Sequence, residues 1–204
     1  MNTEASSSKK EKMRAIRDEV LNLKESPLYT YRTENNYFPV IGEGDHDADI
    51  MFIGEAPGRN EAQKGRPFCG AAGRILDELL ASIELPRESV YITNIVKDRP
   101  EDNRDPLPNE IALYSPFLDR QIDIIQPKVI ATLGRFSMVY ILDKFNIPSS
   151  EPISHAHGKP HTACASYGEI IIVPLYHPAA AIYTQTLKAT LLEDFAALKK
   201  LASA

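Results

Sequence analysis

Apolar positions along the chain fall into two patterns, short continuous runs and repeats spaced three or four residues apart. Continuous runs of this length are typical of buried strands, and three-to-four-residue spacing is typical of helices with one buried face. The runs predict strands over 48–54, 90–96, 128–133 and 169–175. The repeats predict helices over 10–23, 71–83, 109–125, 135–145 and 186–201. Strands that alternate with helices predict an α/β three-layer sandwich, with a central, mostly parallel four-stranded sheet flanked by helices.

The segments without such a pattern complete the predicted organisation. Residues 1–9 are polar and rich in Ser and Lys, so we expect a disordered N-terminal tail. Residues 29–47 are expected to form an ordered loop over the edge of the sheet, and 146–168 a polar loop. Because neither a repeat nor a linker interrupts the rest, residues 10–204 are predicted to form a single domain.

Composition narrows the setting. The chain has 204 residues, a net charge of −5 and two cysteines, Cys69 and Cys164, which are too few for a disulfide framework. The sequence has no membrane-length apolar run and no secretory pattern at its start, so we expect a cytoplasmic protein without membrane contact. The negative charge argues against a nucleic-acid coat protein, but it permits a DNA enzyme, since a local basic patch decides binding.

Two polar residues follow predicted strands and are the first candidates for chemistry. Glu55 comes after the strand over 48–54, and His177 after the strand over 169–175. The carboxyl ends of parallel strands face one crevice, so we expect these side chains to meet there. Glu55 can stabilise a developing cation and His177 a negatively charged leaving group. The alternatives are that Glu55 caps the next segment or pairs with an Arg, and that His177 is structural.

Other residues could shape a pocket at the same crevice. Phe68 lies between a Pro and a Gly before the helix over 71–83, where it could stack on a base or belong to the core. Asn94 interrupts the strand over 90–96 near its carboxyl end, and its amide offers a donor and an acceptor side by side, as reading a pyrimidine edge requires. The small residues around Gly70 expose backbone N–H groups at a helix start, which favours an anion.

Three further features admit more than one interpretation. Arg99 and Arg104 lie in a Pro-rich loop that could contact DNA phosphates or be merely solvated. Ile182 and Tyr183 could supply an apolar wedge for a duplex. Three histidines within 155–161 have metal-like spacing, but no Cys or carboxylate completes the set there, so we predict no metal site.

Taken in order, the motifs resemble the uracil-DNA glycosylase superfamily, and within it family 4. They are GEAPG at 54–58, G-x-PF-x-G-x-x-G at 65–73, YITN at 91–94, RP-x-x-NR-x-P at 99–106, LG at 133–134 and YHPAA at 176–180. The resemblance covers roughly residues 26–200. It implies a DNA-repair hydrolase that flips deoxyuridine out of DNA and cleaves the N-glycosidic bond, which releases uracil and leaves an abasic site.

The resemblance also implies roles for individual residues. Glu55 matches the catalytic acid that positions water and stabilises the sugar cation. His177 matches the imidazole that hydrogen-bonds uracil O2, and Asn94 the amide that reads the O4 and N3–H edge. Phe68 matches the ring that stacks on uracil, and Gly54 belongs to the same uracil-binding set. On the DNA side, Arg99, Arg104, Ile182 and Tyr183 are the expected contacts.

The chain departs from family 4 at the cysteines that hold its [4Fe-4S] cluster. An alignment on residues 27–28 puts Leu23, Ser26, Asp98 and Ser115 at the four ligand positions. None of these supplies the thiolate that such clusters ordinarily require, so we predict no iron–sulfur cluster and no other cofactor.

We therefore expect a monofunctional uracil-DNA glycosylase that works as a monomer on uracil-containing DNA, with downstream repair enzymes as possible partners. Its place of action would be the cytoplasm, on the nucleoid. The alternatives are a glycosylase of the same fold for hypoxanthine or xanthine, a non-catalytic DNA- or uracil-binding module, and an enzyme of free nucleosides.

Overall fold

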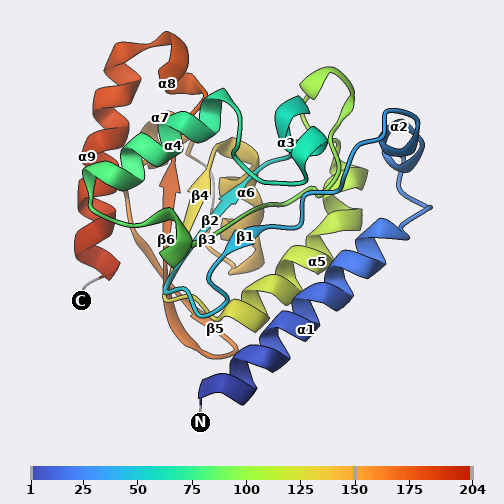
Figure 1. Ribbon diagram of the computed structural model, residues 1–204. Coiled ribbons are helices and arrows are strands. Elements are labelled where there is room, and N and C mark those ends of the chain that lie inside the picture. Colours follow the sequence, from blue (N-terminus) through green and yellow to red (C-terminus); the bar gives the residue numbers. More distant parts are fainter. Residues whose placement is uncertain (1, 149–150, 203–204) are drawn as a thin grey trace.

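The computed structural model describes residues 2–148 and 151–202 (Figure 1). Over these residues the strands form one sheet of six, in the order β1-β3-β2-β4-β6-β5. The strands are β1 (Glu43–Gly44), β2 (Ile50–Gly54), β3 (Tyr91–Asn94), β4 (Val129–Leu133), β5 (His161–Ala165) and β6 (Gly168–Leu175). The four central strands pair in parallel, whereas β1 and β5 pair antiparallel at the two edges.

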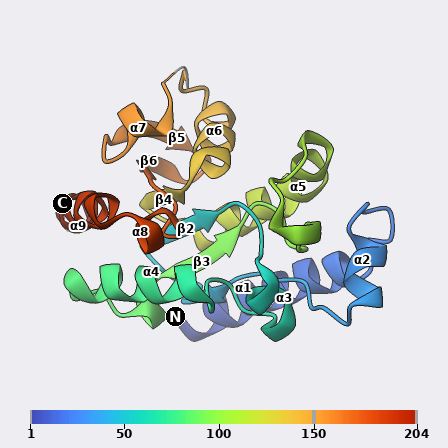
Figure 2. The same cartoon turned by 90° about the horizontal axis from the view of Figure 1, so that it is seen from above.

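Helices cover both faces of this sheet, as Figure 2 shows in a view onto the strand ends. One face carries α1 (Asn2–Leu21), α5 (Pro108–Ile125) and α6 (Arg135–Lys144), and the other carries α4 (Ala71–Ser82) and α9 (Gln185–Ala202). Short helices lie in the connections: α2 (Tyr29–Glu34), α3 (Arg59–Lys64), α7 (Ile153–Ala156) and α8 (Ala180–Tyr183). Each face has its own apolar core, because the buried strands contribute side chains to both sides. The predicted three-layer α/β arrangement is confirmed.

The sheet is larger than predicted, because the two edge strands lack a continuous apolar run. The four predicted strands are the four parallel ones, but β1 and β5 make the sheet six-stranded and partly antiparallel. β1 has only two residues, and β5 alternates exposed and buried positions with polar side chains. Edge strands face solvent along one side, so their composition is more polar than that of central strands. The apolar-run criterion therefore missed both.

The N-terminal segment also differs from the prediction. Helix α1 begins at Asn2, so the backbone of residues 2–9 is helical where a disordered tail was expected. Lys9 ties this end of the helix to the domain: its Nζ lies 2.7 Å from Asp47 Oδ1 and donates to the carbonyl of Ile125 at 3.3 Å. That contact joins residues distant in the sequence, and a local polar pattern cannot show it.

The order of the strands creates a crevice at their carboxyl ends. The chain runs from β2 to its neighbour β3, and then crosses to β4 on the other side of β2. Ligands of open α/β sheets bind where the direction reverses in this way. α3 and α8 lie at this end of the sheet (Figure 1). Over the described ranges, no helix is both long and apolar enough to cross a bilayer.

Candidate active site at the carboxyl ends of the strands

A cavity of about 350 Å³ opens at this crevice. Its walls come from the segments that follow β2, β3 and β6, from the loop before α5, and from the starts of α4 and α8. The lining includes four of the residues singled out in the sequence, Glu55, Phe68, Asn94 and His177. The fold thus brings together side chains that lie up to 122 positions apart in the sequence, from 55 to 177.

Glu55 directly follows β2, and its carboxylate lies against the N-terminus of α6. Its Oε1 accepts a hydrogen bond from the backbone N–H of Phe136 at 3.1 Å. Gly134 leaves the space for this contact, since a Cβ there would overlap Glu55 Oε1. Burial raises the pKa of Glu55 above its ordinary value, although the Phe136 N–H opposes that shift. Glu55 therefore caps α6 and not the helix that follows it in the chain, α3, and the same carboxylate also lines the cavity.

His177 follows β6, and its ring is held in one tautomer. Its Nδ1 accepts a hydrogen bond from the backbone N–H of Ala179 at 3.2 Å, so the ring proton is on Nε2. Burial lowers the pKa of His177 from 6.5 to about 4. At neutral pH the side chain is therefore an uncharged imidazole with one N–H donor.

Phe68 and Asn94 line the same cavity as these two groups. The Phe68 ring lies 5.7 Å from the His177 ring, centroid to centroid, and it also packs in the core on the α4 side. Asn94 is 2% exposed, and its side-chain amide makes no hydrogen bond to any described residue. Gly54 is needed beside them, since a Cβ there would overlap Asn94 Oδ1 and lie 2.7 Å from Phe68 Cζ. The pocket thus offers a free amide beside an aromatic face.

Lys97 supports Asn94 from inside the fold, a role that the sequence did not indicate. Its Nζ is buried and donates to the Asn94 carbonyl at 2.6 Å, to Thr93 Oγ1 at 2.9 Å and to Gln121 Oε1 at 2.5 Å. Burial lowers the pKa of Lys97 well below its ordinary value. In the sequence Lys97 begins the Pro-rich loop that was expected either to contact DNA phosphates or to be solvated, and only the tertiary structure shows that its side chain is buried.

The two arginines predicted to contact DNA are engaged within the protein. Arg99 is 8% exposed, and its guanidinium donates to the hydroxyls of Tyr31 and Tyr37 and to Asn103 Oδ1. Arg104 lines the cavity, and its guanidinium makes two hydrogen bonds to the Glu110 carboxylate, at 2.9 and 2.5 Å. Both side chains therefore brace the loop before α5.

On the opposite wall, Ile182 lines the cavity and is 39% exposed. Tyr183 ends α8, but its side chain lies outside the part of the chain that the structure describes. An exposed apolar side chain at a cavity mouth is suited to contact an unstacked base pair. Ile182 has that position.

Exposed cations near the cavity were not singled out in the sequence. Arg59 directly follows the lining residue Gly58, and Arg74 lies two positions after the lining residue Ala72. Both side chains are exposed, and neither makes a hydrogen bond or ion pair with a described residue. The sequence signal that could have found them is their place beside the two glycine motifs.

The anion expected at the start of α4 belongs to the protein itself. Glu61 Oε1 accepts the backbone N–H groups of Cys69 and Gly70, at 2.9 and 2.7 Å. These two donors are therefore already occupied by a carboxylate of the protein.

The three histidines over 155–161 do not converge. His157 Nδ1 lies 2.9 Å from Asp194 Oδ2, whereas His161 belongs to β5 and pairs in register with Ile172. Within the described ranges, no group of three or more His, Cys, Asp or Glu side chains has the arrangement of a metal site.

The four positions that the sequence resemblance assigned to cluster ligands carry no thiol. Leu23 offers a hydrocarbon, Ser26 and Ser115 offer hydroxyls, and Asp98 a carboxylate that is bound to Arg32. Cluster irons are held by thiolates, so this set does not fit a [4Fe-4S] group.

Comparison with known proteins agrees with the geometry. Residues 41–199 match the family model described as the uracil DNA glycosylase superfamily. A type-4 uracil-DNA glycosylase of Sulfurisphaera tokodaii is 48% identical over 188 residues, which cover 92% of this chain and 83% of that protein. A type-4 uracil-DNA glycosylase of Saccharolobus solfataricus is 45% identical, over 91% of this chain and 84% of that protein. A type-4 uracil-DNA glycosylase of Thermotoga maritima is 36% identical, over 91% of this chain and 92% of that protein.

Proposed function

The chain belongs to the uracil-DNA glycosylase superfamily, and we propose that its cavity takes up a deoxyuridine flipped out of DNA and hydrolyses the N-glycosidic bond. Relatives named type-4 uracil-DNA glycosylase match most of the chain at 34–48% identity. The protein is therefore a uracil-DNA glycosylase of DNA repair. The products of this hydrolysis are free uracil and an abasic site. The observation that carries the proposal is that Glu55 and His177, with opposite chemical capacities, line one cavity.

The substrate must leave the duplex to reach these groups. A base inside the stack is inaccessible, so it has to be extruded at a cost of a few kcal/mol. Contacts of the protein with the extruded base and the flanking strand offset that cost. Ile182, exposed at the cavity mouth, is suited to fill the space that the base leaves. Tyr183 is proposed for the same contact, from its place in the sequence.

Glu55 is proposed to act on the sugar side. As the bond breaks, positive charge develops on the sugar ring, and a carboxylate nearby stabilises it and orients the attacking water. A buried carboxylate acts more strongly than a solvated one, because the local dielectric constant is low. The Phe136 N–H and the N-terminus of α6 favour the charged form of Glu55, and so partly offset the rise in its pKa that burial causes.

His177 is proposed to act on the departing base. Cleavage leaves negative charge on uracil, and an N–H donor at O2 stabilises it. The backbone N–H of Ala179 fixes the proton on Nε2, so the imidazole is prepared to donate. Its pKa of about 4 means that no proton has to be removed first at neutral pH.

Asn94 and Phe68 are proposed to select the base. The Asn94 amide can donate to O4 and accept from N3–H of uracil, whereas cytosine presents the reverse pattern on that edge. A wrong base would leave the buried amide unpaired, which costs about 1–3 kcal/mol. Phe68 would stack on the ring, and Gly54 leaves room for both side chains. Uracil is therefore preferred over cytosine.

We further propose that the protein works without an iron–sulfur cluster, although type-4 uracil-DNA glycosylases usually carry one. The donor set at the ligand positions supports this. We also propose action in the cytoplasm as a monomer, one domain over residues 10–204, with enzymes that process abasic sites downstream. Direct phosphate contacts are assigned first to Arg59 and Arg74, since Arg99 and Arg104 are bonded within the protein.

A labelled oligonucleotide with one uracil tests the activity and the role of Glu55. After incubation and hot alkali, the wild type is expected to give strand scission, and Glu55→Gln to lose about 100-fold or more in rate. Glu19→Gln is the matched control, since Glu19 is an exposed glutamate on α1 that pairs with Arg120. Intact DNA in single-stranded, U:G and U:A contexts would refute the uracil assignment. Scission of hypoxanthine-containing DNA, or binding without scission, would then identify which alternative holds.

A further inference from the structure

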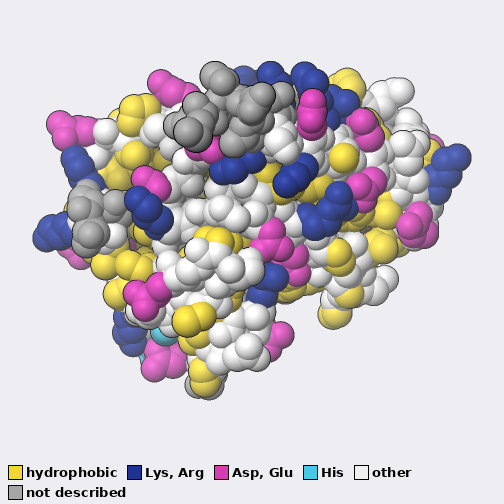
Figure 3. Space-filling model, turned by 90° about the horizontal axis from the view of Figure 1, so that it is seen from below, with side chains coloured by type: hydrophobic (Ala, Val, Ile, Leu, Met, Phe, Trp, Pro, Cys, Tyr) yellow, Lys and Arg dark blue, Asp and Glu magenta, His cyan; other side chains and the backbone are white. Residues whose placement is uncertain are grey.

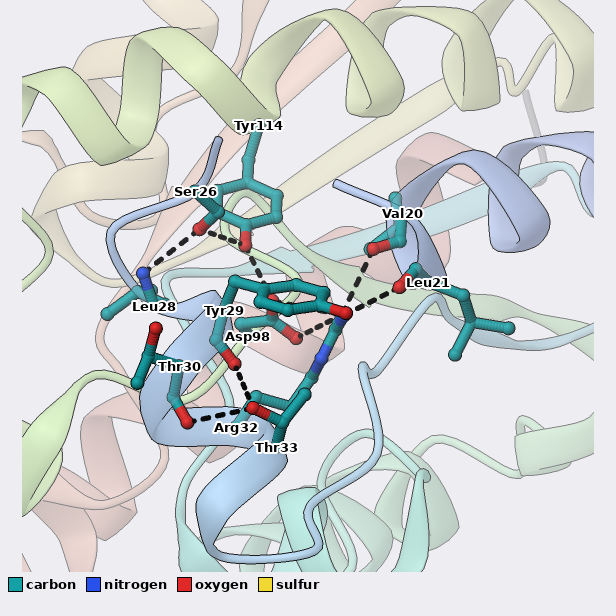
Figure 4. Close-up of polar contacts among 10 residues, drawn as sticks. All are labelled: Val20, Leu21, Ser26, Leu28, Tyr29, Thr30, Arg32, Thr33, Asp98 and Tyr114. Atoms are coloured by element: carbon teal, nitrogen blue, oxygen red, sulfur yellow. Dashed lines mark hydrogen bonds and ion pairs between the residues drawn. The ribbon is translucent and has the colours of Figure 1, made fainter. Parts of the chain in front are cut away.

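A buried polar network includes two of the four positions that the sequence resemblance predicts as cluster ligands (Figure 4). Ser26 and Asp98, two of the four positions, are bridged by Tyr114, whose hydroxyl lies 2.7 Å from Ser26 Oγ and 2.6 Å from Asp98 Oδ2. Arg32 completes the network, with its Nη1 3.1 Å from Asp98 Oδ2. The side chains of both members of this ion pair are at most 5% exposed.

Every hydrogen bond of this network has a defined direction. Asp98 is a carboxylate, so the single hydroxyl proton of Tyr114 goes to it. Ser26 must then donate to Tyr114, and its oxygen accepts the backbone N–H of Leu28 at 3.1 Å. A fully satisfied buried network fixes one arrangement of its members, because any other leaves a polar group unpaired.

Arg32 also connects this network to the end of a helix. Its guanidinium donates to the carbonyls of Val20 and Leu21, the last residues of α1, at 3.0 and 2.7 Å. The last carbonyls of a helix lack partners within the helix, and a cation there is favourable. The Tyr29 ring lies over the guanidinium at 4.9 Å. Arg32 is therefore held by α1 and α2 together.

The network ties three segments that are far apart in the sequence. They are the connection between α1 and α2, the loop that follows β3, and helix α5, to which Ser26, Asp98 and Tyr114 belong. The four positions that the resemblance predicts as cluster ligands lie in these same three segments. Leu23 precedes Ser26 by three residues and its carbonyl accepts the Ser26 N–H, and Ser115 follows Tyr114 directly.

The loop that Asp98 anchors continues into the wall of the cavity. Arg99 is fixed next to Asp98 by Tyr31 and Tyr37, and its Nε donates to Asn103 Oδ1 at 2.7 Å. Asn103 and Arg104 line the cavity. A shift of Asp98 would therefore displace this wall of the pocket.

We propose that the Arg32–Asp98–Tyr114–Ser26 network takes over the structural role of the family's metal cluster and positions the cavity wall formed by residues 100–106. The second part rests on the proposed function, since it concerns the pocket for uracil. Arg32 and Asp98 are thus positioning residues. A cross-link made of hydrogen bonds and one ion pair needs neither iron nor thiolate, so the chain folds to its active form without metal.

The first test is metal content and unfolding of the full chain, produced with added iron and purified without oxygen. We expect no iron or acid-labile sulfide above background, and the same Tm with and without a chelator. Stoichiometric iron and sulfide would overturn the proposal. Neither measurement needs substrate, so their failure is distinguishable from failure of the wild type to release uracil.

The second test compares two arginines that tie parts of the same face. Arg32→Met leaves Asp98 buried without its cation and is expected to lower Tm by about 10 °C. Arg120→Met breaks the exposed pair with Glu19 between α1 and α5 and is expected to lower Tm by less than about 3 °C. Equal shifts would overturn the proposal. Tyr114→Phe keeps the ring and removes the hydroxyl that joins Ser26 to Asp98, so it is expected to lower Tm by an intermediate amount. This milder variant keeps the test usable if Arg32→Met does not fold.

The positioning role has a kinetic readout. Well below Tm, a loss of folded molecules alone lowers kcat and leaves KM unchanged. A displaced wall instead raises KM for uracil-containing DNA, by about threefold or more for Arg32→Met and Tyr114→Phe, and Arg32→Lys restores part of it. An unchanged KM in folded Arg32→Met and Tyr114→Phe would refute the positioning role.

Discussion

At the residue scale, burial shifts the pKa values of the two proposed catalytic groups in opposite directions. Burial favours the neutral form of any titratable group, so it raises the pKa of Glu55 and lowers that of His177. For His177 this is an advantage, because the neutral imidazole is the form that donates to the leaving group. For Glu55 it is a cost, which the N-terminus of α6 and the Phe136 N–H partly offset.

These shifts predict the pH dependence of uracil release under single-turnover conditions. The rate should fall on the acid side with a midpoint above 4.5, the ordinary value for Glu, because Glu55 must be charged. His177 should add no limb near 6.5, since its pKa is about 4. The profile of His177→Asn, slower throughout, should keep the same acid midpoint. A wild-type midpoint at or below 4.5, or a midpoint that shifts in His177→Asn, would contradict the assignment.

The buried imidazole also predicts how stability depends on pH. His177 binds its proton with a pKa of about 4 when folded and about 6.5 when unfolded, so the unfolded state takes up the proton first as pH falls. Stability from this group is complete above pH 6.5 and decreases toward pH 4, by about 3 kcal/mol in total. Urea unfolding of the wild type and His177→Gln across this range should show that difference in slope. Parallel curves would contradict it.

At the scale of elements, the end of β3 depends on a lysine that is enclosed by the fold. Lys97 donates hydrogen bonds to the Asn94 carbonyl, to Thr93 Oγ1 and to Gln121 Oε1. It therefore connects β3 to α5. The side-chain amide of Asn94 faces the cavity only if the backbone at the end of β3 has a fixed orientation. The hydrogen bond from the buried Lys97 Nζ to the Asn94 carbonyl provides that constraint. An ordinary surface lysine would leave this turn free.

Lys97→Met is expected to test this constraint, because it keeps the length of the side chain and removes the donor. Three acceptors lose their partner, so the free energy of unfolding should fall by about 1–3 kcal/mol. The rate on uracil should fall as well, and discrimination against cytosine should weaken, as read from release of each base. Lys128→Met is the control, since Lys128 is exposed and pairs with Asp49 on the surface. Unchanged discrimination would show that Lys97 only stabilises the fold.

The elements also show what the sequence could predict and what it could not. The parallel strands have continuous apolar runs because both of their faces are buried, and the predicted boundaries agree with β2 and β4 to within a few residues. β1 and β5 depend on pairing with a neighbour, which local spacing does not encode. The shared cavity of Glu55, Asn94 and His177 was predictable, because Glu55 and His177 follow strands and Asn94 lies at the carboxyl end of one. Lys97 and Arg99 were misjudged, because burial of a charged side chain is decided by segments far away in the chain.

At the scale of the whole molecule, a protein with a net negative charge must bind DNA, which is also negatively charged. The net charge is −5, and acidic and basic side chains are interspersed over the face at the amino ends of the strands (Figure 3). DNA affinity must therefore come from local charge at the other end, where the cavity opens. The loop arginines there are bonded to Tyr31, Tyr37 and Glu110. Arg59 and Arg74 are exposed beside the cavity and make no ion pair with any described residue.

Arg59 and Arg74 are therefore expected to carry the salt dependence of DNA binding. Each phosphate that a cation neutralises contributes a slope of about −0.7 to −0.9 in a plot of log affinity against log salt concentration. Arg59→Ala and Arg74→Ala should each reduce that slope by about one contact and weaken binding equally for DNA with and without uracil. Arg120→Ala, remote on α5, should leave it unchanged. Titrations with catalytically impaired Glu55→Gln as background measure this without turnover. The opposite result would be a smaller slope in Arg104→Ala and an unchanged slope in Arg59→Ala and Arg74→Ala. It would mean that Arg104 leaves its ion pair with Glu110 to contact DNA, so that the wall of the pocket moves on binding.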